Sequence, residues 1–325
     1  MIFEERVWQL VSITHSKKEK GHRKKPSLVK ELKASWQLYV LLAPVIAFFI
    51  VFHYMPMYGI QIAFRNYRAV FGITGSPWVG LDHFRQFFQA FYFERLITNT
   101  LLLNLYGLLW SFPITIFLAL MLNRIPLRRY KKFTQTVVYA PHFISSVVIA
   151  GMLFIFLSPS TGLVNRAIEA LGGSPIFFMI EAGWFRTIFI SSAIWQSAGW
   201  GTILYLAALT SIDQEMYEAS EIDGASILQK IRYIDLPSVL PIAVMVLILS
   251  TGSLLSSNTQ RALLLQTPGN IPTSDILGLY VFRVGLQGAR FSYTAAIGLF
   301  TNVVNFVIIF SVNMIAKKTS GIAMF

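Results

Sequence analysis

Hydrophobic residues are concentrated in six long runs that contain no Asp, Glu, Lys or Arg. The runs cover residues 34–64, 96–123, 133–165, 187–212, 236–260 and 291–316. A helix needs about 20 apolar residues to cross the hydrocarbon core of a bilayer, and each run is long enough. Backbone groups in lipid must be paired within the same segment, so these runs favour helices. We therefore predict an all-α integral membrane protein with six transmembrane helices, whose cores are residues 37–56, 98–122, 136–157, 187–210, 239–258 and 293–315.

Composition excludes most soluble enzymes. Hydrophobic residues make up 55% of the 325 residues and charged residues only 13%, whereas soluble domains are about 25% charged. The chain has no cysteine, which excludes disulfides, thiolate metal sites and cysteine nucleophiles. It also lacks the phosphate-binding G-x-x-x-x-G-K-[ST] motif, His-Glu-x-x-His and Gly-x-Ser-x-Gly. We therefore predict no catalytic residues, no metal site and no cofactor in this chain.

Basic residues are distributed unequally between the segments that connect the six runs. The tail 1–33 holds nine Lys and Arg, and the segment 124–132 holds five. Over alternate segments, 18 bases lie on the side of both termini and nine on the other side. Since basic segments are retained in the cytoplasm, we predict that both termini are cytoplasmic. The net charge of +12 is then mainly a signal of topology, and no nucleic-acid partner is needed to explain it.

The predicted spans divide the chain into three parts. Residues 1–33 form a basic cytoplasmic N-terminal tail, residues 34–318 a six-span domain, and residues 319–325 a short C-terminal tail. The segment 211–237 inside the six-span domain carries six acids and two bases, although it lies on the predicted basic side. Its apolar residues recur at helical spacing before and after Gly224, which permits a sharp reversal. We therefore predict a cytoplasmic helix–turn–helix between spans four and five.

The same segment resembles a known signature. Glu218-Ala219-Ser220, Gly224 and Ile234-x-Leu236-Pro237 are similar to the E-A-A–x3–G–x9–I–x–L–P signature of ABC importer permeases, with Ser220 in place of the second Ala. In that family the helix–turn–helix is a coupling element that docks in a cleft of the ATPase subunit. The resemblance implies that Glu218 contacts the ATPase and that Gly224 sets the turn. The implied coupling residues are Tyr217, Glu218, Ala219, Ser220, Asp223, Gly224, Ala225, Leu236 and Pro237.

The resemblance extends over about 36–318. Segments similar to polysaccharide and oligosaccharide importer permeases are 52–59, 76–84, 139–144, 199–202 and 291–296. They favour the branch that imports acidic or complex saccharides, of which permeases of bacterial alginate importers are the nearest example. The resemblance implies location in a bacterial inner membrane and an ABC importer assembly. Its other members would be two ATP-binding cassette subunits that bind ATP and Mg, a second permease that we expect to be a different homologous chain, and an extracytoplasmic solute-binding protein.

A saccharide path needs aromatic faces and uncharged hydrogen-bonding groups, because charges inside a membrane are costly. The maltose-importer permease binds its sugar with residues of the spans that correspond to spans four and five. Aligning the coupling signatures places those positions near Gln196, Ser197, Trp200, Ser250, Leu254 and Ser257, although Leu254 has no polar group. Ser250, Ser253 and Ser257 recur at helical spacing on one face. The candidate pathway residues are Gln196, Ser197, Trp200, Ser250, Ser253, Ser257 and Asn258.

Other interpretations of these residues remain open. Small and hydroxyl residues also let membrane helices approach one another, so the serines are equally suited to packing between helices. A secondary transporter or channel that works without an ATPase is the alternative function. The six runs contain no Asp or Glu, which is unfavourable for an ion-coupled transporter because such proteins commonly place carboxylates within the membrane. An intramembrane enzyme is disfavoured by the missing catalytic motifs.

Overall fold

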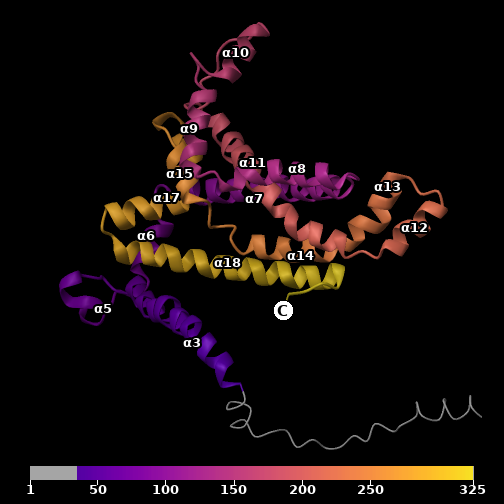
Figure 1. The fold of residues 1–325 in the computed structure, drawn as a ribbon. Helices are drawn as coiled ribbons and strands as arrows, with labels where there is room; N and C mark the ends of the chain where they lie inside the picture. The colour runs from indigo at the N-terminus through magenta and orange to yellow at the C-terminus, as the bar shows by residue number, and fades with distance from the viewer. Residues whose placement is uncertain (1–34, 325) are drawn as a thin grey trace, which may run out of the picture. The chain divides into compact units, whose positions relative to one another are not determined.

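The computed structural model describes residues 35–324. They belong to two compact units, Met1–Gly59 and Ile60–Phe325, which we describe separately. The predicted tail 1–33 lies outside the described residues. Between residues 35 and 324 the chain forms helices and two isolated bridges, Arg65 with Trp78 and Arg68 with Gly72. The protein is therefore all-α in the part that the structure describes, as predicted (Figure 1).

In the first unit the chain is helical from its first described turn. Helix α3 (Trp36–Phe49) continues through a π-helical turn, Ile50–Tyr54, into α4 (Met55–Met57). No residue of α3 is buried. A helix that is apolar on all sides and has no polar face is typical of a membrane span. The helical stretch Trp36–Phe64 is long and apolar enough to cross a membrane, in agreement with the first predicted span.

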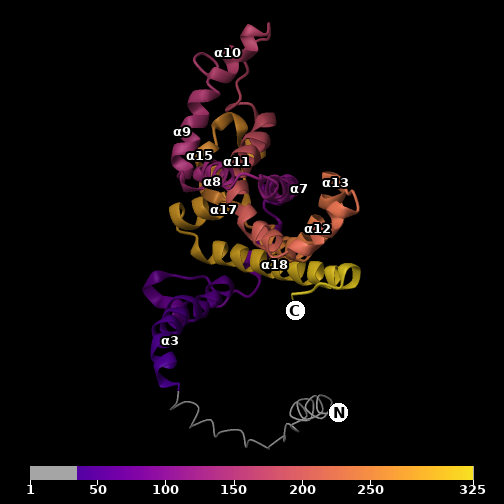
Figure 2. The same cartoon turned by 45° about the vertical axis from the view of Figure 1, so that its right-hand side comes forward.

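In its described residues, 60–324, the second unit contains four long helices and several short ones (Figures 1 and 2). The long helices are α7 (Phe93–Asn123), α11 (Ala182–Thr210), α14 (Leu236–Thr251) and α18 (Phe291–Ser320). The short helices are α5 (Gly72–Gly75), α6 (Asp82–Phe88), α8 (Arg128–Tyr139), α9 (Ser146–Phe156), α10 (Leu163–Ala170), α12 (Gln214–Ile222), α13 (Ile227–Lys230), α15 (Thr259–Leu265), α16 (Ile271–Ser274) and α17 (Leu277–Val281).

Several helices are suited to crossing a membrane. Phe93–Asn123, Ile227–Thr251 and Phe291–Ser320 join Trp36–Phe64 as long apolar helices in the described residues. Helix α11 has 29 residues but is not among them. Its central stretch 195–202 consists of Trp, Gln, Ser, Gly, Ala and Thr, which lowers its hydropathy. The structure thus shows a membrane protein with several apolar helices.

The third predicted span is wrong as a single helix. Residues 136–157 divide into α8, a 3-10 turn (Ala140–Phe143) and α9, and the two helices are bent by 95°. Pro141 cannot donate a backbone hydrogen bond, so the helix is weakened there. Ser145 then starts α9 by accepting a hydrogen bond from the backbone of Val148 at 3.4 Å. The absence of charge in this run did not reveal the bend, and Pro141 was the one signal that the sequence contained.

The fifth predicted span ends earlier than expected. Helix α14 stops at Thr251, and residues 252–258 form turns before α15 begins. Ser250 therefore lies in α14, whereas Ser253 and Ser257 lie beyond its end. The prediction that the three serines share one helical face is wrong. Gly252 follows the helix, where its small size leaves room for Ile309 of α18, 2.9 Å from where a Cβ would lie.

The core of the second unit forms around α7 and α11, which pack extensively on each other. One cluster joins Phe185 of α11 to Leu265 of α15, and another joins Leu122 of α7 to Val239 of α14. The close approach of α11 to α8 requires Gly199, because a Cβ there would lie 2.1 Å from the carbonyl oxygen of Val138. The same helices therefore build the core and carry most of the candidate site.

Candidate functional site

The segment 211–237 forms the predicted helix–turn–helix. Asp213 begins α12 by accepting a hydrogen bond from the Glu215 amide at 3.3 Å, and Ser226 begins α13 in a reciprocal capping pair with Gln229. Gly224 lies between them with φ of 70°, a conformation that glycine adopts without steric cost. Short polar side chains at both helix starts and a glycine at the reversal therefore define the turn locally.

Three side chains anchor residues 211–237, which we call the coupling loop after its predicted role. Asp235 is completely buried and pairs with Arg124, which follows the last residue of α7. The Tyr217 hydroxyl of α12 donates to Asp235 Oδ1 at 2.6 Å, and the Arg124 guanidinium lies 5.4 Å from the Tyr217 ring. Burial and the hydrogen bond to Asp235 raise the pKa of Tyr217 to about 12. The anchor joins α12, α7 and the start of α14.

The outer surface of the coupling loop is apolar and exposed. Ile222 is 87% exposed and Leu228 is 77% exposed, and both flank the turn. Met216, Ile227 and Tyr233 are exposed around them. Glu218 is exposed as well and forms no hydrogen bond or ion pair with the described residues. Apolar side chains and an unpaired carboxylate on one anchored projection are typical of a docking surface.

The predicted coupling residues differ in their structural roles. Tyr217 belongs to the anchor, and Ser220 accepts the Ala225 amide with its carbonyl oxygen at 2.9 Å, which closes the turn. Asp223 is the residue that ends α12. Leu236 and Pro237 form the first turn of α14, where the missing N–H of proline is tolerated. The sequence alone did not identify Arg124 or Asp235 as part of this arrangement.

Four of the predicted pathway residues line one cavity. It has a volume of about 260 Å³ and lies between α7, α11 and the end of α14. Ser197, Ser250, Ser253 and Asn258 contribute to its wall, together with Asn104 of α7. The remaining lining residues are mostly apolar. This pathway cavity, as we call it, therefore combines uncharged hydrogen-bonding groups with an apolar surface.

Gln196, Trp200 and Ser257 do not line the pathway cavity. The Gln196 amide donates to the carbonyl of Ile144 at 2.6 Å, while its oxygen accepts from Arg261. Trp200 stacks on His142 with ring centroids 4.5 Å apart. Both residues therefore hold the bend between α8 and α9 against α11. Ser257 accepts a hydrogen bond from Asn104 at 2.7 Å and lies in a neighbouring cavity.

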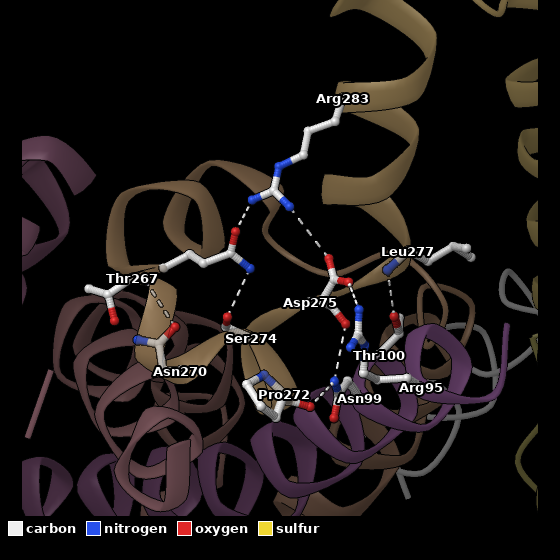
Figure 3. Close-up of polar contacts among 11 residues, drawn as sticks. Arg95, Asn99, Thr100, Thr267, Asn270, Pro272, Ser274, Asp275, Leu277 and Arg283 are labelled. Carbon is white, nitrogen blue, oxygen red and sulfur yellow. Dashed lines mark hydrogen bonds and ion pairs between the residues drawn. The ribbon is translucent and has the colours of Figure 1, made fainter. Parts of the chain in front are cut away.

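A polar cluster fastens the segment after α15 to α7 (Figure 3). Asp275 is nearly buried, and Arg95 of α7 pairs with it at 2.7 Å while Arg283 lies 3.7 Å away on another side. Asn99 of α7 donates to the carbonyl oxygens of Pro272 and Asp275 at 2.8 and 3.1 Å. Two arginines share this carboxylate. In the sequence, the only sign of this polar cluster was a basic residue and an amide one turn apart on α7, Arg95 and Asn99.

Long apolar helices, an anchored helix–turn–helix and an uncharged internal cavity define a class of multi-pass membrane transport protein. A family model for the binding-protein-dependent transport system inner membrane component matches residues 111–321. Protein LplB of Bacillus subtilis (strain 168) is 40% identical over 292 residues, which cover 90% of this chain and 92% of LplB. The chain therefore belongs to the family of binding-protein-dependent transport system inner membrane components.

Further relatives agree over nearly the whole chain. The polygalacturonan/rhamnogalacturonan transport system permease protein YteP of Bacillus subtilis (strain 168) is 40% identical over 299 residues, covering 92% of this chain and 93% of YteP. A crystal structure of a bacterial ABC transporter involved in the import of the acidic polysaccharide alginate contains a similar chain. The alignment to that chain has a TM-score of 0.82 and 41% sequence identity. It covers 90% of the present chain and 99% of the chain in the crystal structure. A second crystal structure, of the bacterial alginate ABC transporter in complex with an alginate pentasaccharide-bound periplasmic protein, matches with a TM-score of 0.83 and 40% identity. It covers 91% of this chain and 99% of the matched chain.

The protein is accordingly a permease subunit of a binding-protein-dependent ABC importer and not an enzyme.

Proposed function

We propose that this permease forms half of a saccharide pathway that is driven by two partner ATP-binding cassette subunits. Those subunits would bind ATP and Mg, a second homologous permease would complete the pathway, and an extracytoplasmic binding protein would deliver the saccharide. In this arrangement six spans cross the membrane and both termini are cytoplasmic. The coupling loop docks on an ATPase and transmits its movement to the spans.

The observation that carries this proposal is the construction of the coupling loop. Its tip exposes Ile222 and Leu228, and its base is fixed by the buried Asp235. An apolar tip that is only solvated would be unfavourable, whereas burial in a cleft contributes about 25 cal/mol for each Å² of apolar surface removed from water. Because the ion pair between Asp235 and Arg124 fixes the base of the loop, a displacement of the tip would be transmitted to α7 and α14. The loop is therefore suited to receive a partner and to transmit its motion.

The proposed cargo is an oligosaccharide or polysaccharide that carries acidic groups. Two kinds of relative support this class: YteP is a polygalacturonan/rhamnogalacturonan permease, and the two structural matches come from importers of alginate. Polygalacturonan, rhamnogalacturonan and alginate are all polymers that contain uronic acids. The pathway cavity, with its hydroxyl and amide groups on an apolar wall, has the chemistry that sugar hydroxyls and ring faces require.

The docking role can be tested with two matched aspartate substitutions. Ile222→Asp places a charge on the tip of the coupling loop, and Leu171→Asp places one on a residue with nearly equal exposure, 89% against 87%. We expect Ile222→Asp to reduce co-purification of the ATPase subunit about tenfold or more, because a desolvated charge in an apolar cleft costs several kcal/mol. Leu171→Asp is expected to have no effect. Equal retention of the ATPase by both variants would contradict the docking role.

Glu218→Ala provides a second, milder test. Because Glu218 is exposed and has no polar partner among the described residues, we expect its loss to leave the fold of the chain unchanged. We expect lower ATP turnover in the assembled importer, with wild-type expression and helicity. Unchanged assembly and turnover would remove Glu218 from the coupling surface. Uptake by the chain alone, with no ATPase present, would instead favour the alternative of a secondary transporter.

The proposed topology can be tested by thiol labelling, since the chain contains no cysteine. Ser174→Cys and Ser320→Cys are nearly isosteric replacements at exposed positions. We expect a membrane-impermeant maleimide to label Ser174→Cys in intact cells, whereas Ser320→Cys requires permeabilised cells. Labelling of both variants in intact cells would contradict a cytoplasmic C-terminus.

A further inference from the structure

A second cavity lies beside the pathway cavity and is larger. Its volume is about 550 Å³, and residues of α7 and α11 line it. Its wall consists of Tyr106, Trp110, Ile114, Gly183, Arg186, Thr187, Ile190, Ser191 and Ile194. Ile190 and Ile194 also line the pathway cavity, so the two spaces adjoin along one face of α11. We call this second space the arginine cavity.

Arg186 is the only charged group in the wall of the arginine cavity. Its Nη2 donates to Asn99 Oδ1 at 3.0 Å, and its Nε is buried with no hydrogen-bond partner among the described residues. A guanidinium has five N–H donors, so most of its donor capacity is unused. Arg95 and Arg124 each pair with an aspartate, whereas Arg186 has no acidic group within 4.0 Å in the described residues.

The position of Arg186 makes an unpaired guanidinium there costly. It directly precedes the uncharged run 187–212, at the end of α11 where that run begins. An unpaired cation at this depth is costly unless water or an anion reaches it. Asn99, to which it donates, is 3% exposed and fastened to the backbone of the segment after α15. Arg186 is therefore held in place with donors remaining for a ligand.

Two aromatic side chains complete the arrangement. Tyr106 and Trp110 are four residues apart on α7, so they lie on the same face of the helix. They are 41% and 58% exposed, although both line the arginine cavity. Exposed aromatic faces beside a guanidinium match a sugar ring that bears a carboxylate, because the ring packs on the aromatic face and the carboxylate accepts two parallel hydrogen bonds.

We propose that Arg186 binds the carboxylate of a uronic-acid unit as an acidic saccharide passes along α11, with Tyr106 and Trp110 supporting its ring. This inference rests on the proposed saccharide pathway and adds a residue that selects for charge. The wall shared with the pathway cavity favours a saccharide over a lipid headgroup, because a saccharide could use the hydroxyl groups on the far side of Ile190 and Ile194, whereas a headgroup would not.

The test measures binding to the assembled importer without the binding protein, so that selection by that protein does not enter. A radiolabelled uronic-acid trisaccharide and its carboxyl-reduced, neutral counterpart are compared by equilibrium dialysis. For Arg186→Gln we expect the dissociation constant of the acidic trisaccharide to rise about tenfold or more, and that of the neutral one to change less than about twofold. Arg186→Lys keeps the charge but not the two-pronged geometry, so an intermediate loss is expected.

Arg290→Gln is the matched control. Arg290 also donates to a side-chain amide, that of Gln86 at 2.8 Å, but it lines neither cavity. An equal loss of affinity for both saccharides in Arg186→Gln would show that Arg186 acts through packing, and would overturn the inference. If the effect of Arg186→Gln on the dissociation constants varies with the anionic lipid content of the sample, Arg186 binds a lipid headgroup, and the inference is again overturned. If the wild-type importer binds neither saccharide, the proposed pathway itself fails and the inference fails with it.

Discussion

Replacing Asp235 by Asn is expected to loosen the coupling loop from α7 and α14 without unfolding the protein. The carboxylate is fully buried, accepts the Tyr217 hydroxyl at 2.6 Å and pairs with Arg124. Asn preserves the volume and one acceptor oxygen but removes the negative charge. The Arg124 guanidinium then has no acidic partner among the described residues, and the base of the loop carries an uncompensated cation.

The magnitude follows from the burial of the two partners. Removing one member of a buried ion pair costs about 3–5 kcal/mol. The Arg124 side chain is 25% exposed. Water therefore screens part of its charge, and we expect a loss near the lower limit, about 3 kcal/mol. Tyr217→Phe removes only a hydrogen bond to a charged group, for which about 2 kcal/mol is expected. At 1.4 kcal/mol for each factor of ten, the equilibrium constant for local opening of the loop rises about 150-fold in Asp235→Asn and about 30-fold in Tyr217→Phe.

Hydrogen–deuterium exchange of the amides in residues 214–235 measures this opening directly. Lys230→Gln is the matched control, because Lys230 pairs at 2.8 Å with Glu221, whose side chain is 70% exposed. Such a pair contributes at most about 1 kcal/mol, so the control is expected to change exchange less than about fivefold. Exchange in α18 should be the same in all variants. If Asp235→Asn exchanges no faster than Lys230→Gln, the buried carboxylate does not anchor the loop.

Three further predictions concern single side chains. Gly199→Ala should lower the thermal stability of the solubilised protein, by about 1–3 kcal/mol, because its Cβ meets the backbone of α8 at 2.1 Å; Gly183→Ala, with no atom within 4 Å, should not. Gln196→Ala should cost about 1–3 kcal/mol in the same assay, because the buried Arg261 guanidinium loses one of its two acceptors and keeps only Ser192. Ser197→Ala, whose hydroxyl bonds only within α11, should leave stability unchanged; a loss equal to that of Gln196→Ala would contradict this reasoning. The Tyr217 hydroxyl, protonated more tightly in the folded loop, should stabilise it fully below pH 10 and lose that contribution as pH rises to about 12, which an absorbance titration of wild type against Tyr217→Phe can follow.

The sequence predicted best what depends on local residue patterns. Uncharged runs indicated α7, α14 and α18, because the energetic cost of charge in lipid acts on each segment separately. The coupling loop was equally predictable, since caps and a glycine turn act within a few residues. The bend at residues 140–145 was not, because an uncharged run permits a bent helix as readily as a straight one. Pro141 was the available signal.

The structure brings together only part of the candidate pathway residues, whose role in transport remains a prediction. Ser197, Ser250, Ser253 and Asn258 share one cavity, whereas Gln196 and Trp200 hold the bend between α8 and α9. A polar or aromatic residue in an uncharged run can face a cavity or a neighbouring backbone, and its identity alone does not decide between these. The anchor residues Arg124 and Asp235 are 111 positions apart, so no local pattern could connect them. Their roles in transport remain predictions.

The ion pair between Arg124 and Asp235 also has a mechanical consequence. It joins the last turn of α7 to the first turn of α14, and these helices contribute Asn104 and Ser250 to the walls of the pathway cavity. At a rise of about 1.5 Å per residue, those wall residues lie about 30 and 20 Å along their helices from the joint. Each degree of tilt at the joint moves the walls by about 0.4–0.5 Å if the helices behave as rigid rods. If the proposed coupling is correct, the ion pair is the joint about which the two helices would tilt. A rotation of a few degrees would then change the width of the cavity by about the diameter of a hydroxyl group.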